Sequence, residues 1–371
     1  MANSRLHQLS ERGQSVWVDS ISREWLDTGF LERLIREDAV VGVTSNPTIF
    51  QKALSEGEWY DDQLREVLAE ETDAKEVFLR LAVEDITRAC ETLRPVWDAG
   101  KGQDGYVSIE VDPELAYDRD ATFEEAMRLH EWVERPNLFV KIPATEPGLG
   151  AIEDSIARGR SINITLIFSL QRHAEVIEAY LRGLERLVED GGNPAPVASV
   201  ASFFVSRVDT EADKRLEAIG TDEALALRGK LAIANAKLAY EQWEQAFSGP
   251  RWEALAGRGA TTQRCLWAST STKNPDYRDV MYVEELIGSE TVNTMPLETI
   301  QAFQEHGVVK PNSILDGVAE AQKLVERLAE VGVDYDDVVT TLEAEGVQKF
   351  ADSFQELLDG IRAKREQLAA A

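Results

Sequence analysis

The chain is poor in the residues that build disulfide-bonded or metal-linked proteins. Its 371 residues include two cysteines and four histidines. The cysteines, Cys90 and Cys265, are too few for a disulfide framework and lack the spacing of metal ligands, so we expect two reduced thiols. The histidines are scattered along the sequence: His7, His130, His173 and His306. Without a His-x-x-x-His pair, a histidine-based metal site is disfavoured, and no metal is expected.

Long apolar runs and an excess of basic charge are also missing. No apolar stretch approaches the roughly 18 residues of a membrane span, and the first residues, MANSRLHQLSERGQ, are polar. We therefore expect a cytoplasmic protein that has no signal peptide or membrane span and does not bind a membrane. Lys and Arg number 39 against 67 Asp and Glu, a net charge of -28. Such a field repels nucleic acid and anionic lipid, and a phosphorylated substrate would need a local cluster of positive charge.

The sequence does contain eight short apolar, β-rich runs, separated by amphipathic helical segments. The runs span residues 15–20, 40–47, 106–112, 137–144, 162–168, 197–209, 264–270 and 291–296. The helical patterns between them include residues 24–37, 174–190 and 228–247. Strands that alternate with helices predict a parallel sheet, and a count of eight predicts a closed α/β TIM barrel, (β/α)8. A doubly wound open sheet is the alternative, but no G-x-G-x-x-G follows the first strand.

The remaining segments extend this barrel. Residues 48–105, between the second and third strands, have room for two or three extra helices, and residues 210–263, between the sixth and seventh, form a second helical insertion. Residues 297–371 are helical in pattern and rich in Glu, Asp and Lys, and we expect them to pack across the barrel mouth. No stretch has the composition of a flexible linker. We therefore predict one domain, residues 1–371, with a helical C-terminal extension.

Polar residues that end the apolar runs are the candidates for a site, because barrel enzymes carry their active sites at the C-terminal ends of the strands. The candidates are Asp19, Asn46, Glu110, Lys141, Thr165, Ser202, Arg207 and Ser269, with Lys273 just beyond. Each of them has an ordinary structural explanation. Their convergence from several strands on one mouth is what favours a functional site.

Lys141 is the most informative candidate. It lies inside the apolar run NLFVKIPA, and strand alternation puts it on one face with Phe139 and Pro143. If that face is the barrel interior, burial disfavours the ammonium form and makes available a neutral amine, which can attack a ketone carbonyl. The alternatives are a lysine paired with an interior carboxylate, Asp19 or Glu110, and a lysine that faces outward between the helices.

Glu110 and Asp19 are the candidates for proton transfer. Formation of an imine and cleavage of the adjacent carbon–carbon bond both need acids and bases, and two carboxyls in different environments can divide these roles. Thr165 could hold a water with Glu110. The structural alternatives remain open: Asp19 could cap the helix that follows it, and Thr165 could be an ordinary core residue. Asp112, before a proline, indicates only a turn.

Three further residues suit substrate recognition. Asn46 lies in an Asn-Pro turn, so its amide could bind substrate hydroxyls or serve the turn alone. Arg207 and Lys273 place cations just past the sixth and seventh strands. The loops after the last strands of a barrel commonly bind phosphate, for which arginine supplies a bidentate clamp and lysine a point charge. Each cation alone is more often an ordinary surface charge.

The order of the motifs resembles that of transaldolases: VWVDS, VTSNPTIF, VSIEVDP, FVKIPAT, INITLIFS, ASFFVSRVD, LWASTSTKNP and TVNTMP. The similarity covers residues 14–310, and the long chain is most similar to the actinobacterial type. It implies a class I aldolase barrel, without a cofactor, in the non-oxidative pentose phosphate pathway. Such an enzyme moves a dihydroxyacetone unit from sedoheptulose 7-phosphate or fructose 6-phosphate to glyceraldehyde 3-phosphate or erythrose 4-phosphate. Sugar phosphates are then the expected partners of a monomer or homodimer.

The resemblance also implies a role for each matching residue. Lys141 is similar to the Schiff-base lysine, and Asp19 to the residue that assists carbon–carbon cleavage. Glu110 and Thr165 resemble the pair that handles the catalytic water. The implied substrate contacts are Asn46, Ser202, Phe204, Arg207 and Ser269. This chain departs from the Ala-Ser-Phe-Arg run of other transaldolases, since residues 268–273 read ASTSTK. We therefore transfer the phosphate role of that arginine to Lys273.

Two other functions remain open. A fructose-6-phosphate aldolase uses the same scaffold and releases free dihydroxyacetone, although the long chain and the Glu110 carboxylate argue against it. A non-catalytic barrel that binds sugar phosphates would need binding groups and no groups for proton transfer. The presence of Lys141, Glu110, Asp19 and Thr165 together therefore favours an enzyme.

Overall fold

The computed structural model describes residues 4–55 and 57–370, with side chains up to residue 367. Its strands form a closed barrel in chain order, and every neighbouring pair is parallel. The strands are β1 (Gln14–Val18), β2 (Val40–Val43), β3 (Tyr106–Glu110), β4 (Leu138–Pro143), β5 (Ile162–Ile167), β6 (Ser199–Phe204), β7 (Gln263–Ala268) and β8 (Thr291–Met295). The predicted (β/α)8 barrel is thus confirmed.

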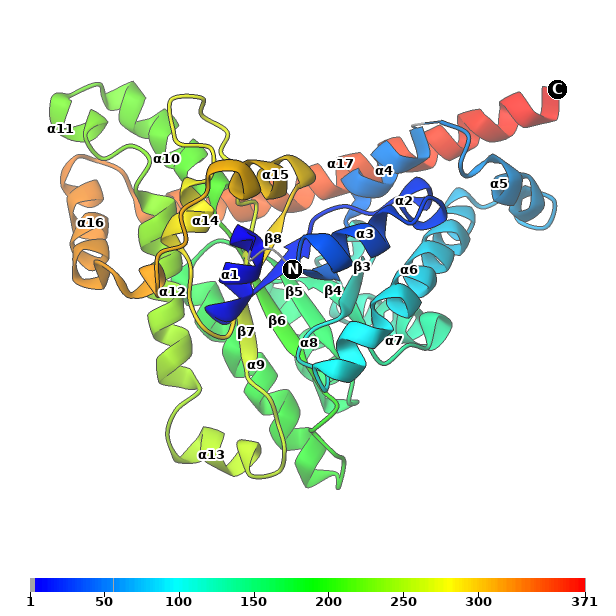
Figure 1. Cartoon of the computed structure of the whole chain (residues 1–371), viewed down its shortest axis with the longest axis horizontal. Helices are drawn as coiled ribbons and strands as arrows, with labels where there is room; N and C mark the ends of the chain where they lie inside the picture. Colours follow the sequence, from blue (N-terminus) through cyan, green and yellow to red (C-terminus); the bar gives the residue numbers. More distant parts are fainter. Residues whose placement is uncertain (1–3, 56, 371) are drawn as a thin grey trace.

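Helices surround this barrel on its outside (Figure 1). Up to β5 they are α1 (Arg5–Glu11), α2 (Arg23–Asp27), α3 (Phe30–Glu37), α4 (Pro47–Ser55), α5 (Asp61–Leu68), α6 (Ala74–Ala99), the 3-10 helix η1 (Pro113–Leu115), α7 (Arg119–Val133) and α8 (Glu146–Ala157). After β5 follow α9 (Leu170–Glu189), α10 (Ser206–Ile219), α11 (Asp222–Leu225), α12 (Leu231–Ala246), α13 (Pro250–Ala256), α14 (Met281–Glu285), α15 (Leu297–His306), η2 (Ser313–Leu315), α16 (Val318–Glu330) and α17 (Tyr335–Ala370). Both long connections hold several helices, as predicted. No helix among these is both long and apolar enough to cross a bilayer.

Two element boundaries differ from the sequence prediction because of glycine and proline. The helix expected over residues 24–37 is two helices, α2 and α3, separated at Gly29, whose φ of 72° lies in the left-handed region that glycine adopts without cost. The second strand, expected to reach residue 47, ends at Val43. Pro47 instead begins α4, because proline suits the first turn of a helix and lacks the N–H that a strand would donate.

The sixth strand differs more. It was predicted to extend over residues 197–209, but β6 ends at Phe204 and α10 begins at Ser206. The prediction was wrong because Val205 and Val208 are β-branched and suggested a strand. Both are fully buried, yet their spacing of three residues also fits one face of a helix. Arg207 therefore lies in the first turn of a helix instead of at a strand end.

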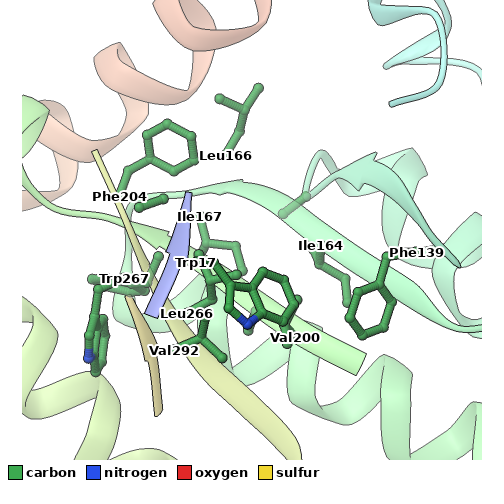
Figure 2. Packing of buried hydrophobic residues seen from close by; sticks show 14 of the residues in the cluster. Trp17, Phe139, Ile164, Leu166, Ile167, Val200, Phe204, Leu266, Trp267 and Val292 are labelled. Atoms are coloured by element: carbon green, nitrogen blue, oxygen red, sulfur yellow. The ribbon is translucent and has the colours of Figure 1, made fainter. Parts of the chain in front are cut away.

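Aromatic side chains fill the barrel beneath the ends of the strands. The rings of Trp17 and Phe139 lie 6.1 Å apart, and Phe139 stacks on Tyr106 at 4.2 Å. Figure 2 shows Trp17 and Phe139 packed with the apolar side chains of neighbouring strands. Two residues further along the chain from Trp17 and Phe139, strand alternation returns Asp19 and Lys141 to the same inner face. Burial of the aromatic layer thus fixes the direction of the polar side chains above it.

Candidate active site

A cavity of about 190 Å³ lies at the C-terminal ends of the strands. Nine of the ten predicted site residues line it: Asp19, Asn46, Lys141, Thr165, Ser202, Phe204, Arg207, Ser269 and Lys273. The tenth, Glu110, lies against Lys141. A larger cavity of about 680 Å³ has none of these residues in its wall and is lined by Trp17, Trp97 and Arg264, among others. The structure therefore gathers the predicted residues in the smaller cavity, where barrel enzymes carry their chemistry.

Lys141 lies in the wall of this cavity. The register of β3 and β4 places it opposite Glu110, and its Nζ lies 3.1 Å from Glu110 Oε2, with both side chains more than nine-tenths buried. Nζ also donates a hydrogen bond to the carbonyl oxygen of Ser45 at 3.0 Å, and the ring of Phe350 lies 5.9 Å away. The outward-facing alternative is wrong. The alternative of a paired lysine holds, and the partner is Glu110.

The two carboxyl groups of the site have different surroundings. Burial raises the pKa of Glu110, and the positive charge of Lys141 partly offsets this effect. Burial also raises the pKa of Asp19, and the strongest opposing influence is a hydrogen bond from the Thr44 hydroxyl. Glu110 is therefore coupled to the lysine, whereas Asp19 is held by a hydroxyl. This separation suits two carboxyls with different roles in proton transfer.

A relay of two hydroxyls lies behind Asp19. Thr44 Oγ1 donates to Asp19 Oδ1 at 2.7 Å, and Thr294 Oγ1 lies 2.6 Å from Thr44 Oγ1. Because the single proton of Thr44 points to the carboxylate, Thr294 is the donor to Thr44. Asp19 is not the cap of the following helix, since Ser22 caps α2 by accepting from the backbone N–H of Trp25. The capping alternative is therefore wrong.

Thr165 is fully buried in the wall of the cavity. Its Oγ1 makes no hydrogen bond to any of the described residues. The next residue, Leu166, has a φ of 60°, and the pairing of β5 with β6 shifts at this point. Buried polar groups are nearly always satisfied by protein or water, so this hydroxyl is suited to hold a water or a substrate oxygen.

Asn46 and Ser202 are each fixed by one hydrogen bond. Asn46 Oδ1 accepts from the backbone N–H of Ile49 at 3.0 Å, so the Asn46 side chain does stabilise the turn. Its amide nitrogen remains available as a donor at the cavity. Ser202 Oγ donates to Asn163 Oδ1 at 2.7 Å, and Asn163 in turn donates to Ser108 at 3.1 Å. Both side chains are thus held in one orientation with hydrogen-bonding capacity left for a ligand.

The two cations predicted to bind phosphate come from different elements. Arg207 lies over the rings of Phe204 and Phe350, at 5.0 and 5.9 Å, and it forms no ion pair within the described part of the chain. Burial lowers its pKa, and the charges of Asp19 and Glu110 oppose this effect. Lys273 donates to Ser271 Oγ at 2.7 Å and is exposed at the rim.

Ser269 completes this side of the cavity. Its backbone adopts a φ of 57°, which is uncommon for a residue other than glycine. Its Oγ lies 2.9 Å from the hydroxyl of Ser206, the first residue of α10. The first turn of α10 has no side-chain cap, and the backbone N–H of Ser206 donates to the carbonyl oxygen of Ser269 at 3.0 Å. A helix N-terminus beside an arginine is well suited to bind an anion.

Sequence reasoning missed several residues of the wall. They are Thr44, Ala268, Ser271, Thr294, Pro296, Lys349 and Phe350. The first five lie within the motifs quoted above, so their position next to the predicted residues could have indicated them. Lys349 and Phe350 belong to α17, far beyond Lys141 in the sequence, and no local pattern marks them. Within residues 4–55 and 57–370, no three His, Cys, Asp or Glu side chains form a cluster that could hold a metal.

Comparison with known proteins identifies the family of this chain. The sequence model of the Transaldolase/Fructose-6-phosphate aldolase family matches residues 16–361. The chain belongs to this family. Its relatives include proteins named transaldolase from Frankia alni, 53% identical over 96% of both chains, and from Parafrankia sp., 54% identical over 99% of this chain and 98% of the relative. A third, from Mycobacterium marinum, is 50% identical over 99% of both chains. The predicted resemblance to the long, actinobacterial type is confirmed.

Proposed function

We propose that this protein is a transaldolase, which carries a dihydroxyacetone unit from a ketose phosphate to an aldose phosphate through an imine on Lys141. The observation that supports this most is the position of the Lys141 amine, which is buried at the end of β4, 3.1 Å from a buried carboxyl and in the wall of a cavity. Membership of the family, with relatives named transaldolase at 50–54% identity, supports the reaction type.

Imine formation uses Lys141, Glu110 and Thr165. Burial raises the pKa of Glu110, so the carboxyl can take up the ammonium proton and leave a neutral amine on Lys141. The amine attacks the ketone carbon and gives a carbinolamine, whose hydroxyl receives the proton from Glu110 and leaves as water. The free hydroxyl of Thr165 holds this water. The resulting imine can accept the electron pair of the neighbouring carbon–carbon bond.

Cleavage of that bond uses Asp19 as a base. Asp19 takes the proton of the substrate hydroxyl beyond the breaking bond, the O–H electrons form the new aldehyde, and the carbon–carbon pair moves into the imine to form an enamine. The aldose phosphate leaves, and a three-carbon enamine remains on Lys141. Attack of the enamine on a second aldose phosphate reverses these steps, and Asp19 returns the proton. Water then hydrolyses the imine and restores the amine.

Substrate recognition divides between hydroxyl and phosphate contacts. Asn46 and Ser202 bind the sugar hydroxyls, and Phe204 forms an apolar wall. Arg207, Ser269 and Lys273 bind the phosphate, helped by the uncapped N-terminus of α10. In a chain of net charge -28, this local positive charge is what reverses the field for an anionic substrate.

A transfer assay tests the proposed function. With fructose 6-phosphate and erythrose 4-phosphate as substrates, we expect sedoheptulose 7-phosphate and glyceraldehyde 3-phosphate to form in equal amounts with little free dihydroxyacetone. Lys141→Arg should lose nearly all turnover, because guanidinium cannot supply a neutral amine. Lys237→Arg is the matched control, since Lys237 is buried to the same degree and paired with Glu285. Release of free dihydroxyacetone at the rate of ketose consumption would instead indicate a fructose-6-phosphate aldolase.

The proposal extends to the setting of the enzyme. We place it in the cytoplasm, where the sugar phosphates of the pentose phosphate pathway are its substrates. Two free, buried cysteines support a reducing compartment. The chain acts as a single domain, as a monomer or homodimer, and sedimentation equilibrium distinguishes these two states.

A further inference from the structure

The C-terminal helix α17 crosses the end of the barrel that holds the site, and contacts along its length fix it there (Figure 1). Near its start, Asp337 accepts from Arg215 at 2.5 Å. In its middle, Thr48 of α4 donates to Ser353 at 2.9 Å, and near its end Lys364 pairs with Asp61 of α5. These partners belong to helices that lie far from α17 in the sequence. The position of α17 over the cavity is therefore set by the fold as a whole.

A glycine brings the middle of α17 down onto the barrel. A Cβ at Gly346 would lie 3.1 Å from Leu166 Cδ2 and 3.3 Å from the ring of Phe168. Glycine inside a helix is less favourable than alanine, and here it permits the close approach of α17 to the end of β5. Figure 2 shows Leu166 and Phe204 at the barrel end nearest this helix. One turn later along α17 come Lys349 and Phe350.

Lys349 lies near two other cations. It lines the same cavity as Arg207 and Lys273, and the positive charge of Arg207 lowers its pKa most, followed by burial and by Lys273. Lys349 forms no ion pair or hydrogen bond with the described residues, although the chain carries many more acidic than basic side chains. Cations held close together without ion pairs of their own repel one another, and a bound anion relieves that repulsion.

We propose that Lys349 is a third cation of the substrate-phosphate subsite, supplied by the C-terminal helix beside Arg207 of α10 and Lys273 of the loop after β7. The inference rests on the proposed function, because it assigns the charge cluster to the phosphate of the sugar phosphate. A phosphate dianion fits this cluster, since it has three oxygens to share between one planar guanidinium and two ammonium groups. Helix α17 is then a part of the site that selects phosphorylated substrates.

Substitution of Lys349 by methionine tests this assignment, because methionine keeps the length and apolar stem and removes the charge. We expect kcat/KM for fructose 6-phosphate to fall about 10-fold, mainly through a higher KM. This is the low end of the effect of a charge-assisted hydrogen bond, because the side chain of Lys349 is exposed at the rim. Competitive inhibition by inorganic phosphate should weaken by a similar factor. Slow turnover of unphosphorylated fructose should not change. Lys349→Arg should retain most of the wild-type value.

Lys364→Met is the matched control, since Lys364 lies on the same helix and pairs with Asp61 away from the cavity. It should leave kcat/KM and inhibition by phosphate at wild-type values. The inference is overturned if Lys349→Met leaves phosphate inhibition unchanged, or if it slows fructose and fructose 6-phosphate equally, which would indicate a packing role. Calorimetric titration with inorganic phosphate separates the two claims. If the wild-type protein lacks transfer activity, the proposed function fails, while weaker phosphate binding by Lys349→Met still supports the cation cluster.

Discussion

Removal of the Thr44 hydroxyl should change the pH dependence of the enzyme while leaving the shape of the site. Thr44→Val is nearly isosteric and deletes the donor that lies 2.7 Å from Asp19 Oδ1. This hydrogen bond stabilises the charged carboxylate and is the strongest influence that lowers the pKa of Asp19 against the effect of burial. A hydrogen bond to a charged group contributes about 1.5–3 kcal/mol, equivalent to about 10- to 150-fold in the ionisation equilibrium.

In the proposed mechanism Asp19 must be ionised to take the hydroxyl proton. Loss of the hydrogen bond from Thr44 should therefore appear on the acidic side of the pH–rate profile. We expect the acidic limb of kcat/KM for fructose 6-phosphate to move to higher pH by about one to two units in Thr44→Val. At alkaline pH the rate should approach that of the wild type. Thr44→Ser is the matched control, since it retains the hydroxyl and should retain the wild-type limb. An unchanged limb in Thr44→Val, or the same displacement in Thr44→Ser, would refute the reasoning.

Three further predictions concern phosphate, pH and packing. Arg207→Ala should lower kcat/KM for fructose 6-phosphate by about 10- to 150-fold and leave kcat/KM for free fructose little affected. Lys273→Ala should cause a smaller loss, because that side chain is exposed. Equal losses for both sugars would contradict this prediction. Burial raises the pKa of Asp209 from 3.8 to about 7, so the folded state retains a proton between these pH values. As pH falls from 7 to 4, the free energy of unfolding of the wild type should therefore rise relative to that of Asp209→Asn, by up to about 1.4 kcal/mol per pH unit. If urea unfolding gives the same stability difference between wild type and Asp209→Asn at pH 7 and at pH 4, the effect is contradicted. A Cβ at Gly42 would lie 2.5 Å from the ring of Trp17, so Gly42→Ala should lower the free energy of unfolding by about 1–3 kcal/mol, and an unchanged urea midpoint would argue against this tight contact.

The barrel could be predicted from the sequence because each strand is buried on both faces and is therefore a short apolar run. The ends of the elements could not be placed as well. Val205 and Val208 are buried whether the chain continues as a strand or turns into a helix, so the apolar pattern did not separate β6 from α10. Pro47 and Gly29 lie at true element boundaries, and their residue types would have placed these two boundaries correctly.

The sequence likewise indicates some residues of the candidate site and not others. Lys141, Glu110 and Thr165 lie inside or at the end of strands, where a polar side chain in an apolar run is conspicuous. Lys349 and Phe350 contribute to the same cavity from a helix whose place depends on its tertiary contacts. A lysine on an amphipathic helix carries no local sign that it faces a site. Proximity between elements distant in sequence is thus the part that only the folded structure supplies.

Borohydride reduction in the presence of fructose 6-phosphate tests the imine on Lys141 most directly. Release of the aldose phosphate leaves a three-carbon unit on the lysine, and hydride should convert the imine to a stable secondary amine at this position. Peptide mapping should find the adduct on Lys141 and none on Lys237, which is buried to the same degree, while Lys141→Arg should remain unmodified and inactive. An adduct on a different lysine, or an active enzyme that borohydride and substrate leave unmodified, would contradict the mechanism.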